Sequence, residues 1–134
     1  MSEVPSRDLI AYRLQQADRA SAEAQLLRQG GYLLGAVNRA YYAMFYAIQA
    51  LLAHRGLKTS THSGVLSLFD REFVKTAFFD RRFSKWLHEL FELRQDADYT
   101  DMFLVTEDQT DEALENARTF VSKVKGFLGG GTER

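Results

Sequence analysis

The chain of 134 residues contains a single proline, Pro5, so nothing beyond the first few residues forces a helix to end. Apolar residues recur at spacings of three and four along most of the sequence, as they do on the buried face of a helix. We find no strand-like alternation, internal repeat or low-complexity segment. The sequence therefore predicts an all-α fold made of long helices.

This periodicity predicts four long helices and one short helix. Their expected ranges are residues 7–28, 32–55, 61–75, 82–97 and 107–128. A loop is expected over residues 98–106, where Thr106 and Gln109 match a capping box before the last helix. Helices joined by brief turns predict an antiparallel up-and-down four-helix bundle with an additional short helix. We expect one helical domain over residues 1–128 and a disordered tail over residues 129–134.

The composition excludes several kinds of catalytic site. Without cysteine, the chain has no disulfide, no thiolate nucleophile and no Cys-ligated metal. The Glu-x-x-His pairs of a di-iron bundle do not occur, and His88 with Glu92 would supply only two ligands. Neither a Walker-type phosphate loop nor G-x-G-x-x-G is present. We therefore expect no metal and no cofactor.

The sequence carries no sign of a membrane segment. No apolar run approaches the ~18 residues of a transmembrane helix. Residues 1–13 hold no apolar stretch of signal-peptide length. Together with the absence of cysteine, these features lead us to expect a cytoplasmic protein with no membrane partner.

Charge is distributed unevenly along a chain whose 17 basic and 18 acidic residues nearly cancel. Residues 71–85 hold five basic and two acidic residues, whereas residues 92–115 hold nine acidic residues against Arg94 alone. Both stretches are compatible with solvated helix faces. The alternatives are a basic surface that binds RNA or an acidic partner, an acidic surface that binds a basic partner, and self-association by contact between the two oppositely charged stretches.

Arg39 lies in the most apolar helix, directly before the aromatic run of residues 40–46. Such an arginine either extends its charged end to solvent from the helix edge or is buried and paired with a carboxylate. Asp96 and Asp98 of the fourth helix are the candidate partners. We expect Arg39 to be largely buried and ion-paired.

Two further polar segments admit both structural and functional interpretations. Arg94 and Asp98 are spaced to pair on one helix, either as a surface ion pair or as part of a polar cluster facing a cleft. In such a cluster the arginine would stabilise a phosphate, and Tyr99 would donate a hydrogen bond or stack. His62, in the hydroxyl-rich turn of residues 58–64, is a helix cap, a surface residue or a catalytic group.

Four segments of this sequence resemble HEPN domains, and more narrowly the small single-domain HEPN proteins of bacteria and archaea. The combination of N-R-x-Y-Y-A-x-F with a downstream R-x-x-A-D-Y carries the resemblance, which extends over residues 8–128. The segments are residues 38–47, 58–65, 69–74 and 94–99.

The resemblance implies an up-and-down four-helix bundle with an additional short helix, usually a homodimer. Many HEPN proteins are toxins encoded beside a minimal nucleotidyltransferase that acts as the antitoxin. Active members are metal-independent RNases with R-x(4–6)-H, and the Arg and His of two protomers meet at the dimer cleft. Such cleavage uses the RNA 2′-OH as nucleophile, with Arg stabilising phosphate charge and His as acid or base.

This sequence departs from that motif after its arginine. Arg94 matches the arginine, but Tyr99 stands five residues further on and no histidine follows. The resemblance therefore makes Arg94 and Tyr99 the candidate catalytic residues, although tyrosine, with a pKa near ~10, is a poor base at neutral pH. It places five more residues in the cleft or motif, namely Asn38, Arg39, Tyr42, His62 and Asp98.

These features lead to one functional expectation and one alternative. We expect a homodimeric toxin with a nucleotidyltransferase antitoxin as partner and RNA or a nucleotide as ligand. The alternative is a non-catalytic homodimeric interaction module that keeps the fold without the chemistry.

Overall fold

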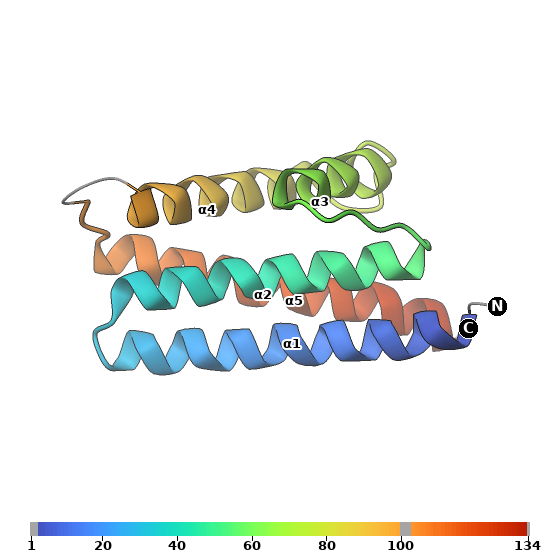
Figure 1. Ribbon diagram of the computed structural model, residues 1–134, viewed down its shortest axis with the longest axis horizontal. Coiled ribbons are helices and arrows are strands. Elements are labelled where there is room, and N and C mark those ends of the chain that lie inside the picture. The colour runs from blue at the N-terminus through green and yellow to red at the C-terminus, as the bar shows by residue number, and fades with distance from the viewer. Residues whose placement is uncertain (1–2, 100–102, 134) are drawn as a thin grey trace.

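The computed structural model describes residues 3–99 and 103–133, and all regular structure over those residues is helical (Figure 1). The predicted all-α class is confirmed. In chain order the helices are α1 (Glu3–Gln29), α2 (Leu33–His54), α3 (His62–Phe69), α4 (Arg81–Tyr99) and α5 (Glu107–Glu133). A short π-helix, η1 (Asp70–Val74), continues directly from α3.

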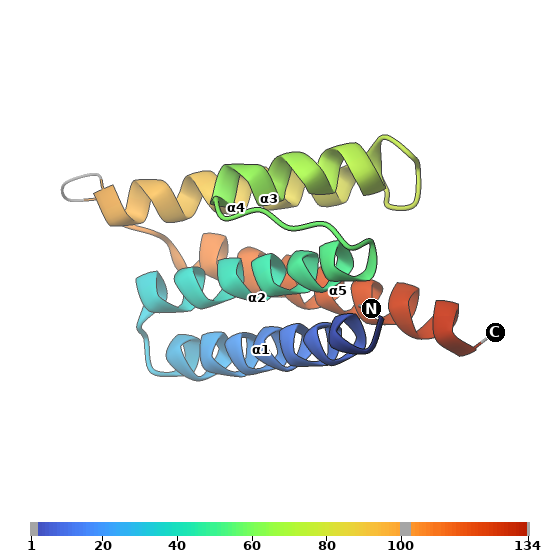
Figure 2. The same ribbon diagram turned by 45° about the vertical axis from the view of Figure 1, so that its right-hand side comes forward.

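The central element of the bundle is α2, which packs against α1, α3, α4 and α5. Figures 1 and 2 show α1 on one side of α2, with α3 and α4 on the other side. Over the described ranges, no Cα atom of α1 lies within 8 Å of a Cα atom of α4. Between them α2 keeps a stripe of half-buried residues, namely Asn38, Arg39, Tyr42, Tyr46 and Gln49. This open side of α2 is where the candidate site lies.

The core forms around α2 because that helix is apolar on most of its surface. Its largest fully buried side chains are Tyr41, Met44, Ile48 and Leu51. From α1 the buried residues Ala17, Ala20 and Ala24 form a small-residue stripe, which lets the two helices approach closely. Buried phenylalanines from the second half of the chain pack against one another, namely Phe69, Phe73, Phe79, Phe83 and Phe120.

Local chemistry sets the helix ends. The predicted capping box is confirmed, because the Thr106 backbone N–H donates to Gln109 Oε1 (2.9 Å) and the Gln109 N–H donates to Thr106 Oγ1 (3.0 Å). Thr61 caps α3 by accepting from the Gly64 N–H at 2.9 Å. Gly56 follows α2 at a φ of 71°, a conformation that side chains disfavour.

Several helix boundaries differ from the sequence prediction, and α1 begins at Glu3, four residues before its predicted start. The expected helix over 61–75 divides into α3 and η1, which keeps both Phe69 and Phe73 fully buried. The predicted loop over 98–106 is wrong at its start, because Asp98 and Tyr99 continue α4. At the C-terminus α5 runs through Glu133, past the predicted end at residue 128, since glycine weakens a helix without forbidding it. The division into a domain over 1–128 and a tail over 129–134 stays a prediction.

Candidate functional site

The candidate site is centred on Arg94 of α4, whose guanidinium reaches across to the aromatic run of α2. Its Cζ lies 5.1 Å from the ring centroid of Tyr41 and 5.4 Å from that of Tyr42. Its Nη2 donates to the Tyr42 hydroxyl at 3.4 Å, and its Nε lies 3.7 Å from Asp98 Oδ2. We call Arg94, Tyr41, Tyr42, Asp98 and His62 the Arg94 cluster.

Arg94 points inward because it shares a helix face with residues that form the core. Leu87 and Leu90 of α4 are buried and lie seven and four residues before it, so its stem follows the same inward-facing row. The side chain is only 16% exposed. Its buried Nε donates no hydrogen bond within the described part of the chain. A buried charged donor without an acceptor is costly, so a shift of the side chain that exposes this donor to a ligand oxygen would be favourable.

His62 reaches the same cluster from the first turn of α3. Its Nδ1 lies 3.1 Å from the Tyr41 hydroxyl, and its ring lies 4.5 Å from that of Phe45. Burial, together with the nearby charge of Arg94, lowers the pKa of His62 below its ordinary value. Burial raises the pKa of Tyr41, so its hydroxyl stays protonated. Near neutral pH the cluster therefore pairs a neutral imidazole with a charged guanidinium.

Arg39 also lies over Tyr42, from the side that faces α1. Its Cζ is 5.2 Å from the Tyr42 ring centroid, and its Nη1 donates to Glu23 Oε1 at 2.9 Å. The predicted carboxylate partner is therefore present, but it is Glu23 of α1. The expected partners on α4, Asp96 or Asp98, are wrong because Arg39 projects from the α1 side of α2. The side chain is 29% exposed, which makes it half-buried and not largely buried as expected.

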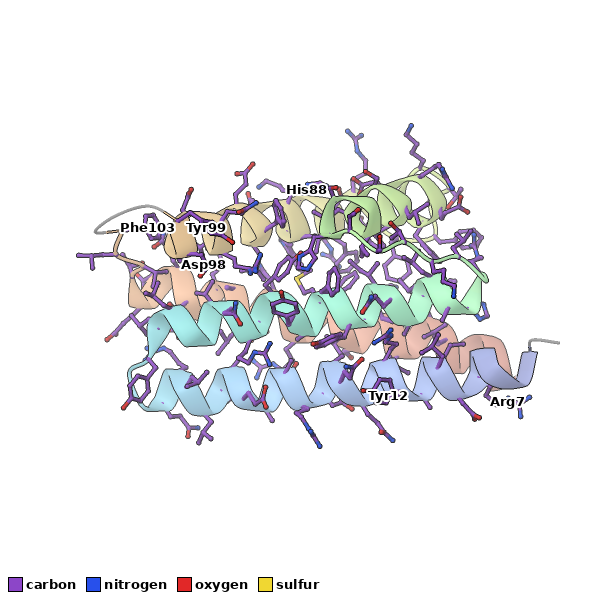
Figure 3. All side chains as sticks on the ribbon, viewed as in Figure 1. Arg7, Tyr12, His88, Asp98, Tyr99 and Phe103 are labelled. Atoms are coloured by element: carbon purple, nitrogen blue, oxygen red, sulfur yellow. The ribbon has the colours of Figure 1, made fainter. Side chains whose placement is uncertain are left out.

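The structure does not bring every predicted site residue into this cluster. Tyr99 ends α4 next to Asp98 with 75% of its surface exposed (Figure 3), and over the described residues its side chain makes no hydrogen bond or ring contact with the Arg94 cluster. Asn38 is half-buried on α2 and likewise makes no hydrogen bond to the cluster over residues 3–99 and 103–133. The catalytic roles of Arg94 and Tyr99 stay predictions.

Two residues of the site were not singled out from the sequence. Tyr41, which joins His62 to Arg94, was included only as part of the motif segment 38–47, although its place directly before Tyr42 was a usable signal. The sequence gives no such signal for Glu23, because its pairing with Arg39 depends on how α1 and α2 are aligned in the fold. In the part of the chain that the structure describes, no three His, Asp or Glu side chains lie close enough together to hold a metal ion. No described helix combines the length and apolar character needed to span a membrane.

The fold and the site define a small helical-bundle protein that holds an arginine and a histidine on the aromatic face of its central helix. The model of the HEPN domain matches residues 10–127, so the chain belongs to the HEPN family. The family that the sequence motifs resemble is thereby confirmed.

Several relatives match over most of their length. A Thermotoga maritima protein, named only as a UPF0332 protein, is 39% identical over 120 residues, which cover 90% of this chain and 86% of that protein. Two proteins of Methanocaldococcus jannaschii carry the name "putative toxin". One is 30% identical over 86% of this chain and 78% of its own length, and the other is 30% identical over 91% and 90%.

Proposed function

We propose that this protein is the toxin of a toxin–antitoxin pair and that the Arg94 cluster contacts the phosphate of RNA or of a nucleotide. Membership of the HEPN family and the names of the two archaeal relatives support the toxin assignment. By the same family resemblance, the antitoxin is a nucleotidyltransferase protein, the toxin is a cytoplasmic homodimer, and the two genes are adjacent.

One observation carries the assignment of the ligand. Arg94 is mostly buried among aromatic rings, yet its Nε finds no hydrogen-bond acceptor among the residues that the structure describes. Guanidinium groups bind phosphate oxygens through paired N–H donors, and such bonds are stronger where water is excluded. The carboxylate of Asp98, 3.7 Å away, holds the group in place without occupying that donor.

The position of His62 favours cleavage of the bound RNA as the reaction. In the tautomer that donates from Nδ1 to the Tyr41 oxygen, His62 Nε2 has a free lone pair. His62 takes the proton of a ribose 2′-OH as that oxygen attacks the phosphorus. The bond from phosphorus to the 5′-oxygen breaks, a 2′,3′-cyclic phosphate forms, and the leaving oxygen takes a proton from His62 or water. Arg94 stabilises the charge that develops on the phosphate.

The toxin assignment is tested by inducing the wild-type chain and the Arg94→Ala variant in cells and following growth and total RNA. We expect growth arrest with the wild type, relief of that arrest by Arg94→Ala, and protection when the adjacent nucleotidyltransferase gene is co-expressed. Arg81→Ala is the matched control, since Arg81 is an exposed arginine at the other end of α4. Equal growth of the wild type and Arg94→Ala at equal protein levels would contradict the proposal.

The second candidate function is a non-catalytic homodimeric interaction module. It is favoured by an apolar patch at one end of the bundle, where Tyr32, Leu34 and Leu104 are 67%, 46% and 84% exposed. Such a patch is typical of a protein–protein contact. Light scattering of Leu34→Asp tests this function: conversion of a dimer to a monomer supports it, and an unchanged mass removes this patch from the interface.

A further inference from the structure

A polar groove of about 190 Å³ lies between α1 and α2, next to the Arg94 cluster. Apart from Ala20 and Glu23, its lining residues are Tyr12, Gln15, Gln16, Arg19, Arg39 and Tyr46. We propose that this groove binds a nucleoside and its phosphate, one step along a single RNA strand from the phosphate held at Arg94. This inference rests on the proposed function and extends its site from α4 across α2 to α1.

Tyr42 makes the cluster and the groove one continuous surface. The guanidinium carbons of Arg94 and Arg39 lie 5.4 Å and 5.2 Å from the same Tyr42 ring centroid. Arg39 is also a wall of the groove, and the ring of Tyr46, another wall, lies 5.7 Å from that of Tyr42. A strand that contacts Arg94 therefore meets a second arginine and then the groove, without crossing another helix.

The groove residues offer the contacts that single-stranded RNA uses. Tyr12 is 54% exposed and Tyr46 is half-buried, so both offer aromatic surface to a base. Stacking on aromatic rings accepts any base, and the amide of Gln15 and the NH₂ group of Gln16 offer hydrogen bonds to base edges, while the Gln16 oxygen already accepts from Arg13 at 2.8 Å. The lining is therefore polar and aromatic, which suits a nucleoside better than an apolar side chain of a protein partner.

Charge favours a polyanion on this side of the molecule. Two arginines and one glutamate line the groove, and because Glu23 pairs with Arg39, the unpaired charge of the lining is the positive charge of Arg19. Arg19 is exposed and makes no ion pair or hydrogen bond within the described residues, so its charge is available to a phosphate. The chain as a whole carries −1, with its acidic residues concentrated in 92–115. The groove is thus a local cationic region on a slightly acidic protein.

The test is a titration of a fluorescein-labelled, single-stranded octaribonucleotide, followed by anisotropy at several salt concentrations. The variants are Arg19→Ala and Tyr12→Ala, whose side chains lie outside the core. Arg81→Ala and Phe78→Ala are the matched controls, since both residues are exposed and lie away from the groove. Arg81 also belongs to the basic stretch 71–85, the other candidate surface for RNA.

We expect Arg19→Ala to weaken binding by about fivefold or more and to reduce the slope of log K against log salt by about 0.7, the value for one phosphate contact on a single strand. Tyr12→Ala should weaken binding by about fivefold or more through lost stacking and leave that slope unchanged. Both controls should bind as the wild type does.

The outcomes that overturn the inference are distinct from those that overturn the proposed function. If Arg94→Ala abolishes binding while Arg19→Ala and Tyr12→Ala bind normally, the groove is not part of the site and the proposed function stands. If Arg81→Ala binds the RNA as weakly as Arg19→Ala does, the RNA binds the basic stretch 71–85 instead of the groove. If Arg19→Ala or Tyr12→Ala dissociates a dimer in light scattering, the groove is a subunit interface. If the wild type binds no RNA even at low salt, the inference and the RNA ligand both fail.

Discussion

At the residue scale, Arg94 and His62 owe their chemistry to the aromatic rings that surround them. The guanidinium is held over two tyrosine rings, which attract a cation while excluding water. The imidazole of His62 belongs to the same cluster and is hydrogen-bonded to Tyr41. Burial and the charge of Arg94 lower its pKa and so keep it neutral. The charge of Arg94 thus helps to keep His62 neutral, the state in which an imidazole accepts a proton.

The lowered pKa of His62 makes stability depend on pH. Because its pKa is lower in the folded chain, the unfolded chain binds the proton more readily, and the free energy of unfolding should fall as pH drops through ~6.5. The loss should level off below the folded pKa. Urea denaturation of the wild type and His62→Gln between pH 8 and pH 5 measures it, and the variant should show a shallower slope.

His54→Gln is the control for this pH effect, since His54 is an exposed histidine at the end of α2. It should retain the wild-type slope. A wild-type slope in His62→Gln as well would show that His62 is not responsible.

Ala77 adopts a φ of 68°, the left-handed region that glycine enters without steric cost. It lies in the turn between η1 and α4 and is exposed. We expect Ala77→Gly to raise the free energy of unfolding by about 0.5–1 kcal/mol, since the relieved strain exceeds the added chain entropy. Thermal unfolding measures this, and a lower melting temperature than that of the wild type would contradict it.

The sequence predicted that Arg39 pairs with a carboxylate, but it did not identify which carboxylate. The need for a carboxylate follows from the place of Arg39 in an apolar helix, because an unpaired buried charge is costly. The choice of Glu23 depends on the rotation of α2 between α1 and α4, which is set by packing across the whole bundle. For the same reason the sequence could name His62 and Arg94 separately but could not place them on one pair of tyrosines.

At the element scale, helix starts follow from local chemistry that the sequence displays directly. The Thr106–Gln109 capping box was readable because both partners lie within one turn. The π-helical turn η1 could not be read from the sequence in this way. Its hydrogen bond runs from the Lys75 N–H to the carbonyl of Asp70, five residues earlier, and it accompanies the burial of the Phe69 and Phe73 rings. Long helices are therefore predictable from periodicity, and their irregularities depend on tertiary contacts.

The capping box gives a prediction for α5. Thr106→Ala removes the acceptor for the Gln109 N–H and should lower the free energy of unfolding by about 1 kcal/mol. Gln109→Ala removes the reciprocal bond to the Thr106 N–H. Chemical denaturation of the wild type, both single variants and the double variant gives a double-mutant cycle for the free energy of unfolding. Their effects should be coupled, and strictly additive losses would indicate that the two bonds do not act as a unit.

At the scale of the whole molecule, buried phenylalanines join the second half of the chain into one core. Phe79 is 2% exposed and contacts the rings of Phe69, Phe83 and Phe120, which belong to three different helices. Its neighbour Phe78 is 52% exposed. This loop is therefore fixed to the core by one of its two aromatic residues.

Phe79→Ala should lower the free energy of unfolding by about 3–5 kcal/mol, because it opens a cavity where α3, α4 and α5 meet. Phe78→Ala is the matched control and should cost much less, since half of its ring is already in water. Equilibrium denaturation compares the two. Similar losses for both variants would contradict the assignment of Phe79 as the anchor.

The arrangement of the helices also decides where a ligand has access. Over the described chain no Cα atom of α1 lies within 8 Å of one of α4, and Tyr42 of α2 is half-buried between them, with Arg39 paired to α1 on one side and Arg94 of α4 on the other. This half-buried aromatic face and its two arginines are the structural basis of the proposal that the ligand is RNA or a nucleotide.

The most direct test is the affinity of the purified protein for a labelled single-stranded RNA, with Arg94→Ala compared to Arg81→Ala. Circular dichroism establishes that both variants keep the helical fold. We predict that the wild type and Arg81→Ala bind alike, while Arg94→Ala binds at least about tenfold more weakly, as expected for the loss of a buried charged contact. Equal affinity for the wild type and Arg94→Ala would contradict the assignment of Arg94 as the phosphate-binding residue.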